Sequence, residues 1–336
     1  MSERLSVIVP VYNAADYLSR CLDALLNQGV ENYEIVCVND GSTDSSGALL
    51  REYWQKNPQI IRIVEQENQG LPAARNAGLA VADGTIIAFC DADDYLIPHA
   101  YGYLLRECWK EGLDMLKFNS ITLDQYVQKS WTETNEVSGS VVYEGDGFTY
   151  IRERHPNFSF VWSYLYSASF LRKNQLKFRP FKQCEDVAFN LDAYMCNPRV
   201  MQVTSNLYRY MVSPGQVTRI RNPRHMRIVV QHYVGLFENM TRYIKEKPEV
   251  SDALRLYREQ EMVPCMSRIL TANYNKEEFI SVRGTFRHLD MLPLKQMNKA
   301  GRVINLLMAN YVMYAMGSFL YRKIFLPYVL PRLGRN

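Results

Sequence analysis

The first 120 residues predict an α/β domain built on a doubly wound, mostly parallel sheet flanked by helices. Short apolar runs rich in β-branched residues alternate with amphipathic stretches, and the starts of four such runs lie 25 to 28 residues apart. Continuous apolarity is typical of strands that are covered on both faces, as in a parallel sheet with crossover helices. The four expected strands are LSVIVPVY (5–12), YEIVCVND (33–40), IIRIVEQE (60–67) and TIIAFCDA (85–92).

Helix signals lie between these runs. Asn13 is placed to cap a first helix. The apolar residues of that helix recur with the period of one helix face and are Leu18, Cys21, Leu22, Leu25 and Leu26. Prolines at favoured starting positions predict two further helices, over 72–82 and over 98–111. Residues 42–44 predict a capping turn after the second strand.

The remaining chain predicts a second, helical region. Residues 121–150 are polar and punctuated by glycine, which indicates a hairpin or a mobile loop. An aromatic stretch follows from Phe158, and a helix is expected to open at Glu185. After about Pro223 the pattern is helical, so we expect a first domain over 1–220 and a helical C-terminal extension over 221–336.

Charge is unevenly distributed along the chain. Residues 1–120 carry a net −8 and residues 199–336 a net +13, within a total of +4. The basic segment predicts an anionic partner such as a membrane surface, a phosphorylated substrate or nucleic acid. Its charges are dispersed among apolar residues without a recognition motif, which argues against nucleic acid.

Cysteine usage and the N-terminus bear on location. The seven cysteines are scattered and never spaced as CxxC, which favours reduced thiols in the cytosol over disulfides or a zinc site. The first apolar run begins at Leu5, so we expect no signal peptide and a cytoplasmic protein.

A dense group of carboxylates follows the fourth expected strand. Asp91, Asp93 and Asp94 occupy three of four consecutive positions, where their charges repel one another. Such a group is either a solvated acidic turn or a site for a hard divalent cation, which prefers oxygen ligands. The carboxyl ends of parallel strands meet at one edge of a sheet, where ligands bind, and this favours the cation site.

Five motifs occur in order over roughly residues 1–200: VIVPVYN, VNDGSTDSS, NQGLPAARNAG, FCDADD and CEDVAFN. In this order and spacing the chain resembles the family 2 glycosyltransferases of the GT-A fold. The resemblance implies inverting transfer of a hexosyl or N-acetylhexosaminyl group from a nucleotide sugar, usually UDP-linked, to an acceptor hydroxyl. It further implies Mg²⁺ or Mn²⁺ as cofactor and a role in assembling cell-surface or capsular polysaccharide.

The resemblance also implies which residues bind the donor. Tyr12 matches a ring that stacks on uracil, although a strand-end aromatic that only packs is the alternative. Asp40 matches the acceptor of the uracil N3–H, and Arg75 either lies near the donor or is a solvated helix residue. Pro10 and Ala92 belong to the matching motifs and are expected beside the donor.

Metal and catalytic roles follow from the same resemblance. Asp93 matches the residue that binds the cation bridging the donor phosphates, and Asp91 a contact to ribose or to the metal. Asp186 matches the general base, with Glu185 beside it as orienting residue or acceptor contact, and the motif leaves open which of the two is the base. Acidic residues are also common in the first turn of a helix without a catalytic role, and this is the alternative. The same pattern places Asp94 near the sugar. Trp162, just upstream, is expected either to stack on a sugar face or to pack in the core, as aromatic residues at alternating positions often do.

Other classes of protein agree less well with these motifs. Sugar nucleotidyltransferases and NAD-dependent dehydrogenases would carry a glycine-rich loop after the first strand, where this chain has PVYNAADY. A catalytically silent sugar- or nucleotide-binding module is compatible with the motifs, although the intact Asp40, Asp91, Asp93 and Asp186 argue against it.

A charge-free run of 19 residues, Val303 to Tyr321, lies in the basic part of the chain and is followed by Arg322 and Lys323. It predicts either an amphipathic helix on the inner face of the cytoplasmic membrane, or a terminal helix that packs on protein, within the chain or at a dimer contact. The membrane alternative suits a family whose members extend glycans or lipid-linked oligosaccharides. We therefore expect residues 303–336 to make one of these two contacts.

Overall fold

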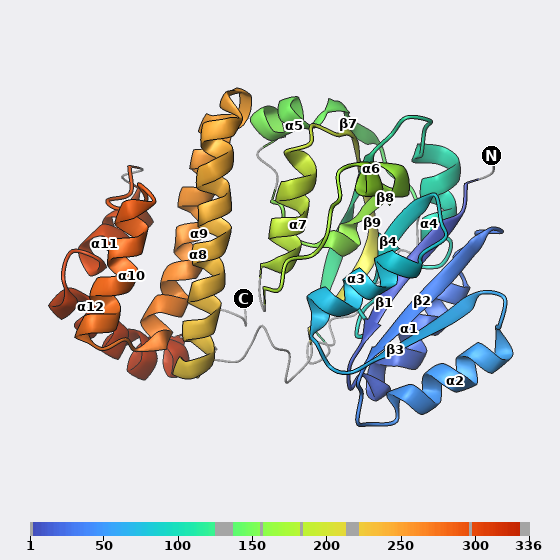
Figure 1. Ribbon diagram of the computed structural model, residues 1–336, viewed down its shortest axis with the longest axis horizontal. Coiled ribbons are helices and arrows are strands. Elements are labelled where there is room, and N and C mark those ends of the chain that lie inside the picture. The colour runs from blue at the N-terminus through green and yellow to red at the C-terminus, as the bar shows by residue number, and fades with distance from the viewer. Residues whose placement is uncertain are drawn as a thin grey trace. The chain divides into compact units, whose positions relative to one another are not determined.

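The computed structural model describes residues 3–124, 137–154, 157–181, 184–212, 222–295 and 298–329. The chain forms two compact units, Met1–Pro214 and Gly215–Asn336. The first unit is built on one large sheet with helices on both faces (Figure 1). The second unit consists of helices.

The sheet of the first unit has nine strands among the described residues, in the order β3-β2-β1-β4-β8-β6-β9-β5, with β7 paired to β9. The four N-terminal strands run parallel to one another, as the sequence predicts. Beyond β4 the sheet is mixed, because β8 pairs antiparallel with both β4 and β6. The strands are β1 (Leu5–Val11), β2 (Tyr33–Asp40), β3 (Ile61–Gln66), β4 (Ile86–Phe89), β5 (Tyr95–Leu96), β6 (Met115–Asp124), β7 (Val141–Asp146), β8 (Tyr164–Ser167) and β9 (Arg199–Val212).

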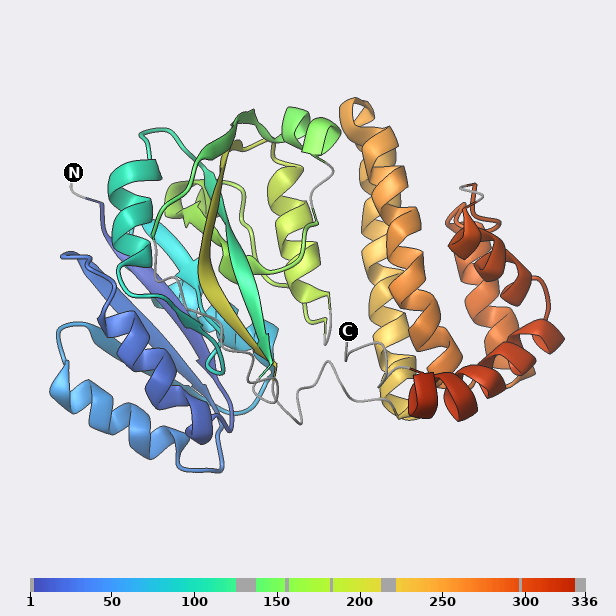
Figure 2. The same ribbon diagram turned by 180° about the vertical axis from the view of Figure 1, so that it is seen from behind.

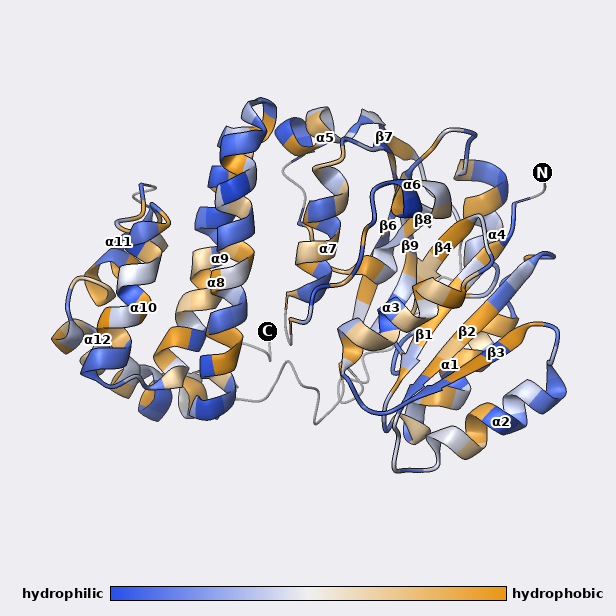
Figure 3. Cartoon of the chain, in the orientation of Figure 1, coloured by the Kyte–Doolittle hydropathy of each residue, from blue (hydrophilic) through white to orange (hydrophobic). Residues whose placement is uncertain are grey.

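Helices cover both faces of this sheet. The face seen in Figure 2 is covered by α1, whose buried Leu18, Cys21 and Leu22 share a core with alternate residues of β1. On the opposite face α3 approaches so closely that a methyl group at Gly78 would lie 2.4 Å from Ile8. The strands between these layers are almost wholly hydrophobic (Figure 3), as burial on both faces requires. The helices of the first unit are α1 (Ala15–Leu26), α2 (Ser46–Lys56), α3 (Leu71–Val81), α4 (Ala100–Tyr103), α5 (Gly147–Arg154), α6 (Ala168–Lys173) and α7 (Glu185–Tyr194).

Two helix starts differ from the sequence prediction. Helix α1 begins at Ala15 rather than behind an Asn13 cap, because Asn13 has φ 49° and accepts a hydrogen bond from the Thr43 N–H (2.8 Å). The cap of α1 comes instead from Asp44, which accepts from the Ala15 N–H at 3.1 Å. The helix expected over 98–111 is α4, which starts only at Ala100 and continues as a π-helical turn to Cys108.

The polar segment 121–150 is also more regular than predicted. Strand β6 continues to Asp124, and Val141–Asp146 forms β7, which pairs antiparallel with β9 rather than with β6. The two strands therefore do not form a hairpin with each other. The part of this segment over 125–136 lies outside the described residues.

The second unit is helical, as the sequence predicts. Its helix α12 is anchored by two buried hydroxyls, because Tyr314 donates to the Ile269 carbonyl (3.1 Å) and Ser318 to the Leu270 carbonyl (2.7 Å). These anchors fix which face of α12 is buried. The helices are α8 (Pro223–Glu246), α9 (Ser251–Ala272), α10 (Lys276–His288), α11 (Lys299–Leu307) and α12 (Tyr311–Leu320), and a π-helical segment follows over Tyr321–Val329.

Helices α11 and α12 and the π-helical segment that follows them carry several exposed apolar side chains, which together are called the apolar patch. Its residues are all about half exposed or more and comprise Val303, Leu306, Val312, Met316, Phe319, Leu320 and Ile324. In the described part of the chain, no helix taken singly has the length and hydropathy to cross a bilayer. The pair Lys299–Leu307 and Tyr311–Pro327 meets both criteria together, but it is bent by 117°.

Candidate active site

The carboxyl ends of β1, β2 and β4 lie together because these strands are parallel neighbours. Tyr12, just beyond β1, has an exposed ring with 51% of its surface accessible. Pro10 lies within β1 opposite Val38, and both Pro10 and Ala92 are buried. The carboxyl ends of these strands therefore lie at one edge of the sheet, as the sequence predicts, and Tyr12 is an exposed aromatic side chain at that edge.

Asp40 ends β2 and fixes the loop that leads into α3. One carboxylate oxygen accepts from the Gln66 side chain (2.6 Å) and the Gln69 N–H (2.9 Å), and the other accepts from the Gly70 N–H (2.8 Å). Gly70 has φ 87°, a backbone conformation that favours glycine. Asp40 thus has a structural task that sequence reasoning did not predict. It is only 3% exposed, although Oδ2 accepts just one of these bonds and so keeps a lone pair for a further donor.

The three carboxylates after β4 differ in their surroundings. Asp91 is partly exposed and accepts from Arg75 through Oδ1 at 2.8 Å. Asp93 is partly exposed, and its backbone carbonyl accepts from Arg20 (2.6 Å). Asp94 is fully buried and accepts from the Tyr208 hydroxyl (2.8 Å) and the Met211 N–H (2.7 Å).

Burial, together with the neighbouring charges of Asp91 and Asp93, raises the pKa of Asp94 to about 9 against the opposing effect of its hydrogen bonds from Met211 and Tyr208. The carboxyl is therefore held in its neutral form and packs against β9. This corrects the expectation that Asp94 contacts a sugar, since its side chain has no accessible surface.

Arg75 connects the end of β4 with the start of α7. It projects from α3 and is 2% exposed. One guanidinium nitrogen donates to Asp91 at 2.8 Å and the other to Glu185 at 3.0 Å. Arg75 is therefore a buried ionic link and not a solvated helix residue. Arginine suits this position because its planar fork presents two donors at a fixed spacing.

Glu185 and Asp186 open α7, as the sequence predicts. Glu185 is 8% exposed, and burial together with the adjacent Asp186 raises its pKa to about 7 against the opposing effect of Arg75. Burial also raises the pKa of Asp186, although hydrogen bonds from Phe160 and Val187 and the charge of Arg75 act in the opposite direction. A carboxylate with a raised pKa is a stronger base, which suits proton abstraction near neutral pH.

Asp186 is oriented by the backbone. Its Oδ2 accepts from the Phe160 N–H at 2.7 Å and its Oδ1 from the Val187 N–H at 2.8 Å. Phe160 (φ 71°) and Cys184 (φ 66°), which flank this carboxylate, both adopt left-handed backbone conformations. Each such non-glycine residue costs about 1–3 kcal/mol, and strain of this kind concentrates at functional sites.

Trp162 is buried within a stack of aromatic rings. It lies nearly parallel to Tyr208 (centroids 4.1 Å apart, 6°) and to Phe160 (4.7 Å, 24°), and it is 3% exposed. The expectation that Trp162 stacks on a sugar is therefore wrong, because its ring faces protein rings. Phe160, at 42% exposure, is the accessible ring of this group.

Sequence reasoning missed Tyr208 and Phe160. Tyr208 accepts from the Asp91 N–H (3.1 Å) as well as donating to Asp94, so β9 supports the carboxylate cluster. No motif signals this contact, because the partners lie 117 and 114 positions apart. For Phe160 the only signal was its place in the aromatic stretch upstream of Glu185.

The residues present suit a divalent cation that is held partly by its substrate. Across the part of the chain that the structure describes, no three His, Cys, Asp or Glu side chains are grouped to hold a metal by themselves. Asp91 and Asp93 are partly exposed hard-oxygen ligands at a strand end. Because Mg²⁺ commonly combines one or two carboxylates with substrate phosphates, this donor set fits such an ion.

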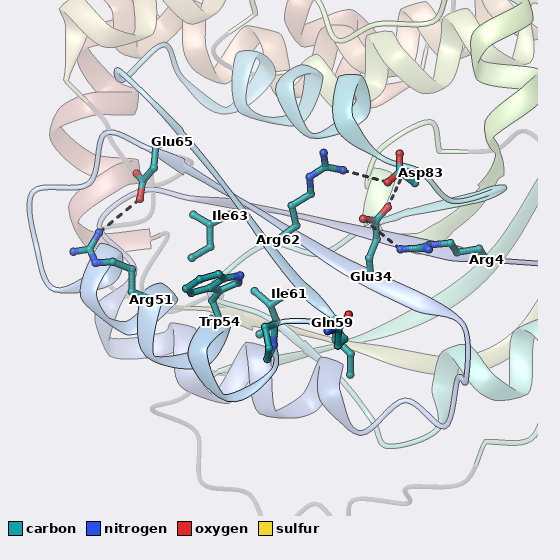
Figure 4. A pocket seen from close by; sticks show the side chains of 12 residues that line it. Arg4, Glu34, Arg51, Trp54, Gln59, Ile61, Arg62, Ile63, Glu65 and Asp83 are labelled. Atoms are coloured by element: carbon teal, nitrogen blue, oxygen red, sulfur yellow. Dashed lines mark hydrogen bonds and ion pairs between the residues drawn. The ribbon is translucent and has the colours of Figure 1, made fainter.

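A cavity of about 570 Å³ lies away from these residues, along the edge strand β3 (Figure 4). Trp54, Ile61 and Ile63 form its apolar floor, and the Arg62–Asp83 ion pair lies at its rim. Arg4, Glu34 and Asp83 lie near the amino ends of the parallel strands. Its position does not coincide with the strand ends that carry the candidate catalytic residues.

Comparison with known proteins identifies the class. The model of the glycosyl transferase family 2 matches residues 6–173, so the chain belongs to this family. The chain is 30% identical over 255 residues to a poly(ribitol-phosphate) beta-glucosyltransferase of Bacillus spizizenii, covering 72% of this chain and 37% of that protein. Two other curated relatives are spanned over 34% and 63% of their length.

Two solved structures share the fold. Staphylococcus aureus TarS 1–349 in complex with UDP-GlcNAc has a TM-score of 0.54 and 19% identity, with 90% of each chain covered. The mannosyltransferase PcManGT of Pyrobaculum calidifontis, in complex with GDP-Man and Mn²⁺, has a TM-score of 0.56 and 16% identity, covering 96% of this chain and 88% of that one. The predicted family and GT-A fold are thereby confirmed.

Arg75→Gln tests the electrostatic role of the buried link. Arg75 lowers the pKa of both Glu185 and Asp186, so its removal raises both values. A base must be deprotonated to act. The acidic limb of the pH profile of nucleoside diphosphate release should therefore move to higher pH, and activity should fall more at pH 6 than at pH 8.

Breaking a buried ion pair costs about 3–5 kcal/mol, so circular dichroism must show that Arg75→Gln is folded under the assay conditions. Arg62→Gln is the matched control, because its pair with Asp83 is exposed and contributes only about 0–1 kcal/mol. An acidic limb that stays in place in folded Arg75→Gln would contradict the electrostatic role.

Proposed function

We propose that the chain is an inverting glycosyltransferase that uses a UDP-sugar and acts in the assembly of a cell-surface polysaccharide. The buried link from Asp91 through Arg75 to Glu185 carries this proposal. It joins the strand end suited to a nucleotide diphosphate to the helix start that carries the candidate base. Both halves of a transfer reaction are thus held in one rigid arrangement.

The donor would lie over the carboxyl ends of β1, β2 and β4. The exposed ring of Tyr12 offers a stacking surface for a nucleobase, and the remaining lone pair of Asp40 Oδ2 suits the N3–H of uracil. The UDP-GlcNAc complex of TarS supports a UDP-sugar donor. The GDP-Man complex of PcManGT supports the alternative, a GDP-sugar, and a screen of donors would distinguish the two.

Asp91 and Asp93 would hold a divalent cation together with the donor phosphates. Such an ion supplies Lewis-acid stabilisation of the charge that develops on the departing diphosphate. Arg75 keeps one oxygen of Asp91 engaged, so the carboxylate is oriented before any ligand arrives. The Mn²⁺ in the PcManGT complex supports a metal in this fold.

Asp186 would act as the general base. In a single displacement the acceptor oxygen bonds to the anomeric carbon as the bond to the diphosphate oxygen breaks, and the acceptor proton passes to Asp186. The diphosphate leaves with the bonding electrons, and the configuration inverts. Asp186 suits this role better than Glu185, since it is partly exposed whereas Glu185 is buried against Arg75.

Asp186→Asn tests this assignment. The amide keeps the shape of the side chain but cannot accept the proton, so turnover should fall by about 10²–10⁴-fold while UDP affinity is retained. Asp93→Asn is the contrasting variant, in which Mn²⁺-dependent UDP affinity should be lost. The measurements are UDP release for turnover and calorimetry for affinity.

The assignment fails if Asp186→Asn loses UDP affinity and turnover equally, because that result places Asp186 in the donor pocket. If Glu185→Gln alone abolishes turnover, Glu185 is the base. Unchanged metal dependence in Asp93→Asn removes that residue from the ligand set.

The acceptor and the location of the enzyme form the last part of the proposal. The relationship to a poly(ribitol-phosphate) beta-glucosyltransferase supports a polysaccharide or lipid-linked glycan as acceptor. In the sequence the charge-free run on α11 and α12 is flanked by Arg302, Arg322 and Lys323, a pattern suited to an anionic lipid surface. We place the enzyme at the cytoplasmic face of the membrane, held by the apolar patch.

Vesicle binding tests the membrane contact. Wild-type protein should co-sediment with phosphatidylglycerol vesicles at low salt and dissociate as salt rises, because the attraction is screened within about 10 Å at 0.1 M salt. Replacing Met316, Phe319 and Leu320 by Ser should weaken partitioning at least about tenfold, since apolar burial contributes about 25 cal/mol per Å².

Val263→Ser and Ile280→Ser are matched controls, because both side chains are about half exposed but lie on α9 and α10 outside the patch. They should leave partitioning unchanged. If the wild-type protein ignores the vesicles but forms a concentration-dependent dimer that the triple variant lacks, the patch is a homodimer contact. Met308 belongs to the same charge-free run, but it is 3% exposed and cannot contribute.

A further inference from the structure

We propose that the ring of Phe160 is the platform on which the acceptor sugar stacks, next to the base. This inference rests on the proposed function and assigns a residue for the acceptor that the sequence motifs do not identify. It commits to an acceptor whose terminal unit is a pyranoside, because the apolar C–H face of a sugar ring suits an aromatic surface. Exposure, backbone geometry and ring stacking support it separately.

Phe160 differs in exposure from the other aromatic residues of its segment. Phe158, Trp162, Tyr164 and Tyr166 are at most 3% exposed, whereas Phe160 is 42% exposed. A single exposed aromatic is unremarkable on a protein surface. The position of this one beside a candidate catalytic carboxylate is what distinguishes it.

The backbone of Phe160 is fixed beside Asp186. Its N–H donates to Asp186 Oδ2 (2.7 Å), and its carbonyl accepts from the Ser163 N–H (3.0 Å) and hydroxyl (2.7 Å). These three bonds maintain a left-handed conformation (φ 71°, ψ 77°) that a phenylalanine rarely adopts. A strained conformation that is fixed on both sides indicates that the direction of this side chain matters.

The ring is supported from behind by a stack of buried rings. Trp162 lies 4.7 Å from Phe160, and Tyr208 lies 4.1 Å from Trp162. Tyr208 in turn donates to Asp94 and accepts from the Asp91 N–H. Phe160 is thus connected to the carboxylates that follow β4 through the packed rings of Trp162 and Tyr208. Binding a sugar on it therefore requires little reordering of the protein.

The ring of Phe160 and the proposed donor site have different neighbours. Tyr12 is the exposed ring at the strand ends, where the nucleobase is proposed to lie. The backbone N–H of Phe160 bonds to the candidate base, so we expect a sugar that rests on this ring to present a hydroxyl toward Asp186. Holding a hydroxyl in line with its base is a large part of what an enzyme contributes to such a transfer.

The test measures UDP release from UDP-glucose, UDP-galactose and UDP-GlcNAc, with octyl β-glucoside, octyl β-galactoside and octyl β-N-acetylglucosaminide as acceptor probes. At least one glycoside should stimulate release by the wild-type enzyme. Phe160→Leu keeps an apolar side chain without an aromatic face, and it should raise the KM for that glycoside about three- to tenfold. Phe160→Trp should restore a KM near that of the wild type.

Two measurements separate this role from a structural one. UDP affinity by calorimetry should stay within about twofold in Phe160→Leu, and the near-ultraviolet circular dichroism should show an intact aromatic core. Trp54→Leu is the matched control, because Trp54 is a 44% exposed aromatic in the cavity beside β3. That variant should leave the acceptor KM unchanged.

The inference is overturned if Phe160→Leu leaves the acceptor KM unchanged, or if it weakens UDP binding as much as acceptor use. It is also overturned if the wild-type enzyme hydrolyses a UDP-sugar but no glycoside stimulates release, which leaves the proposed donor chemistry standing. If the wild-type enzyme releases UDP under none of these conditions, the proposed donor class fails, and the inference fails with it.

Discussion

The candidate site depends on one buried, positively charged side chain, that of Arg75. Arg75 is 2% exposed, and its guanidinium lies between the carboxylates of Asp91 and Glu185, which are 16 and 110 positions away in the sequence. A buried charge is tolerated only when it is paired and hydrogen-bonded. The start of α7 must therefore lie against the end of β4 wherever Arg75 is buried. This requirement brings the start of α7, which carries Asp186, to the carboxyl end of β4.

The groups around Arg75 extend the same arrangement. Asp40 holds the loop that leads into α3, the helix that carries Arg75. Tyr208 supports Asp91 and Asp94 from β9 and continues through the stacked rings to Phe160, which bonds to Asp186. The carboxylates at the two ends of this network thus have fixed orientations before any ligand binds. In many enzymes, preorganised charge of this kind makes the largest single contribution to the rate enhancement, because it stabilises the transition state.

The sequence predicted those features that depend on residues close together in the chain. The parallel strands β1, β2 and β4 are buried along their whole length, so their continuous apolar runs were sufficient to identify them. The ordered motifs identified the family, and the positions of Asp91 and Asp186 at a strand end and a helix start followed. The antiparallel pairing of β8 with β4 and β6 depends on segments far apart in the chain, and no periodicity reveals it. Alternation also could not tell that Phe160 rather than Trp162 is exposed, because the left-handed residue at Phe160 interrupts the alternation of faces.

A double-mutant cycle on Asp91→Asn and Glu185→Gln tests the role of Arg75 most directly. Each single variant leaves Arg75 with one carboxylate, whereas the double variant leaves a buried guanidinium with neither. The free energies of unfolding, measured with denaturant on the full chain, should therefore be non-additive by at least about 1 kcal/mol, with the double variant less stable than the sum predicts. Additivity within about 0.3–0.5 kcal/mol would mean that the two carboxylates are independent, and the account of Arg75 as the link would be wrong.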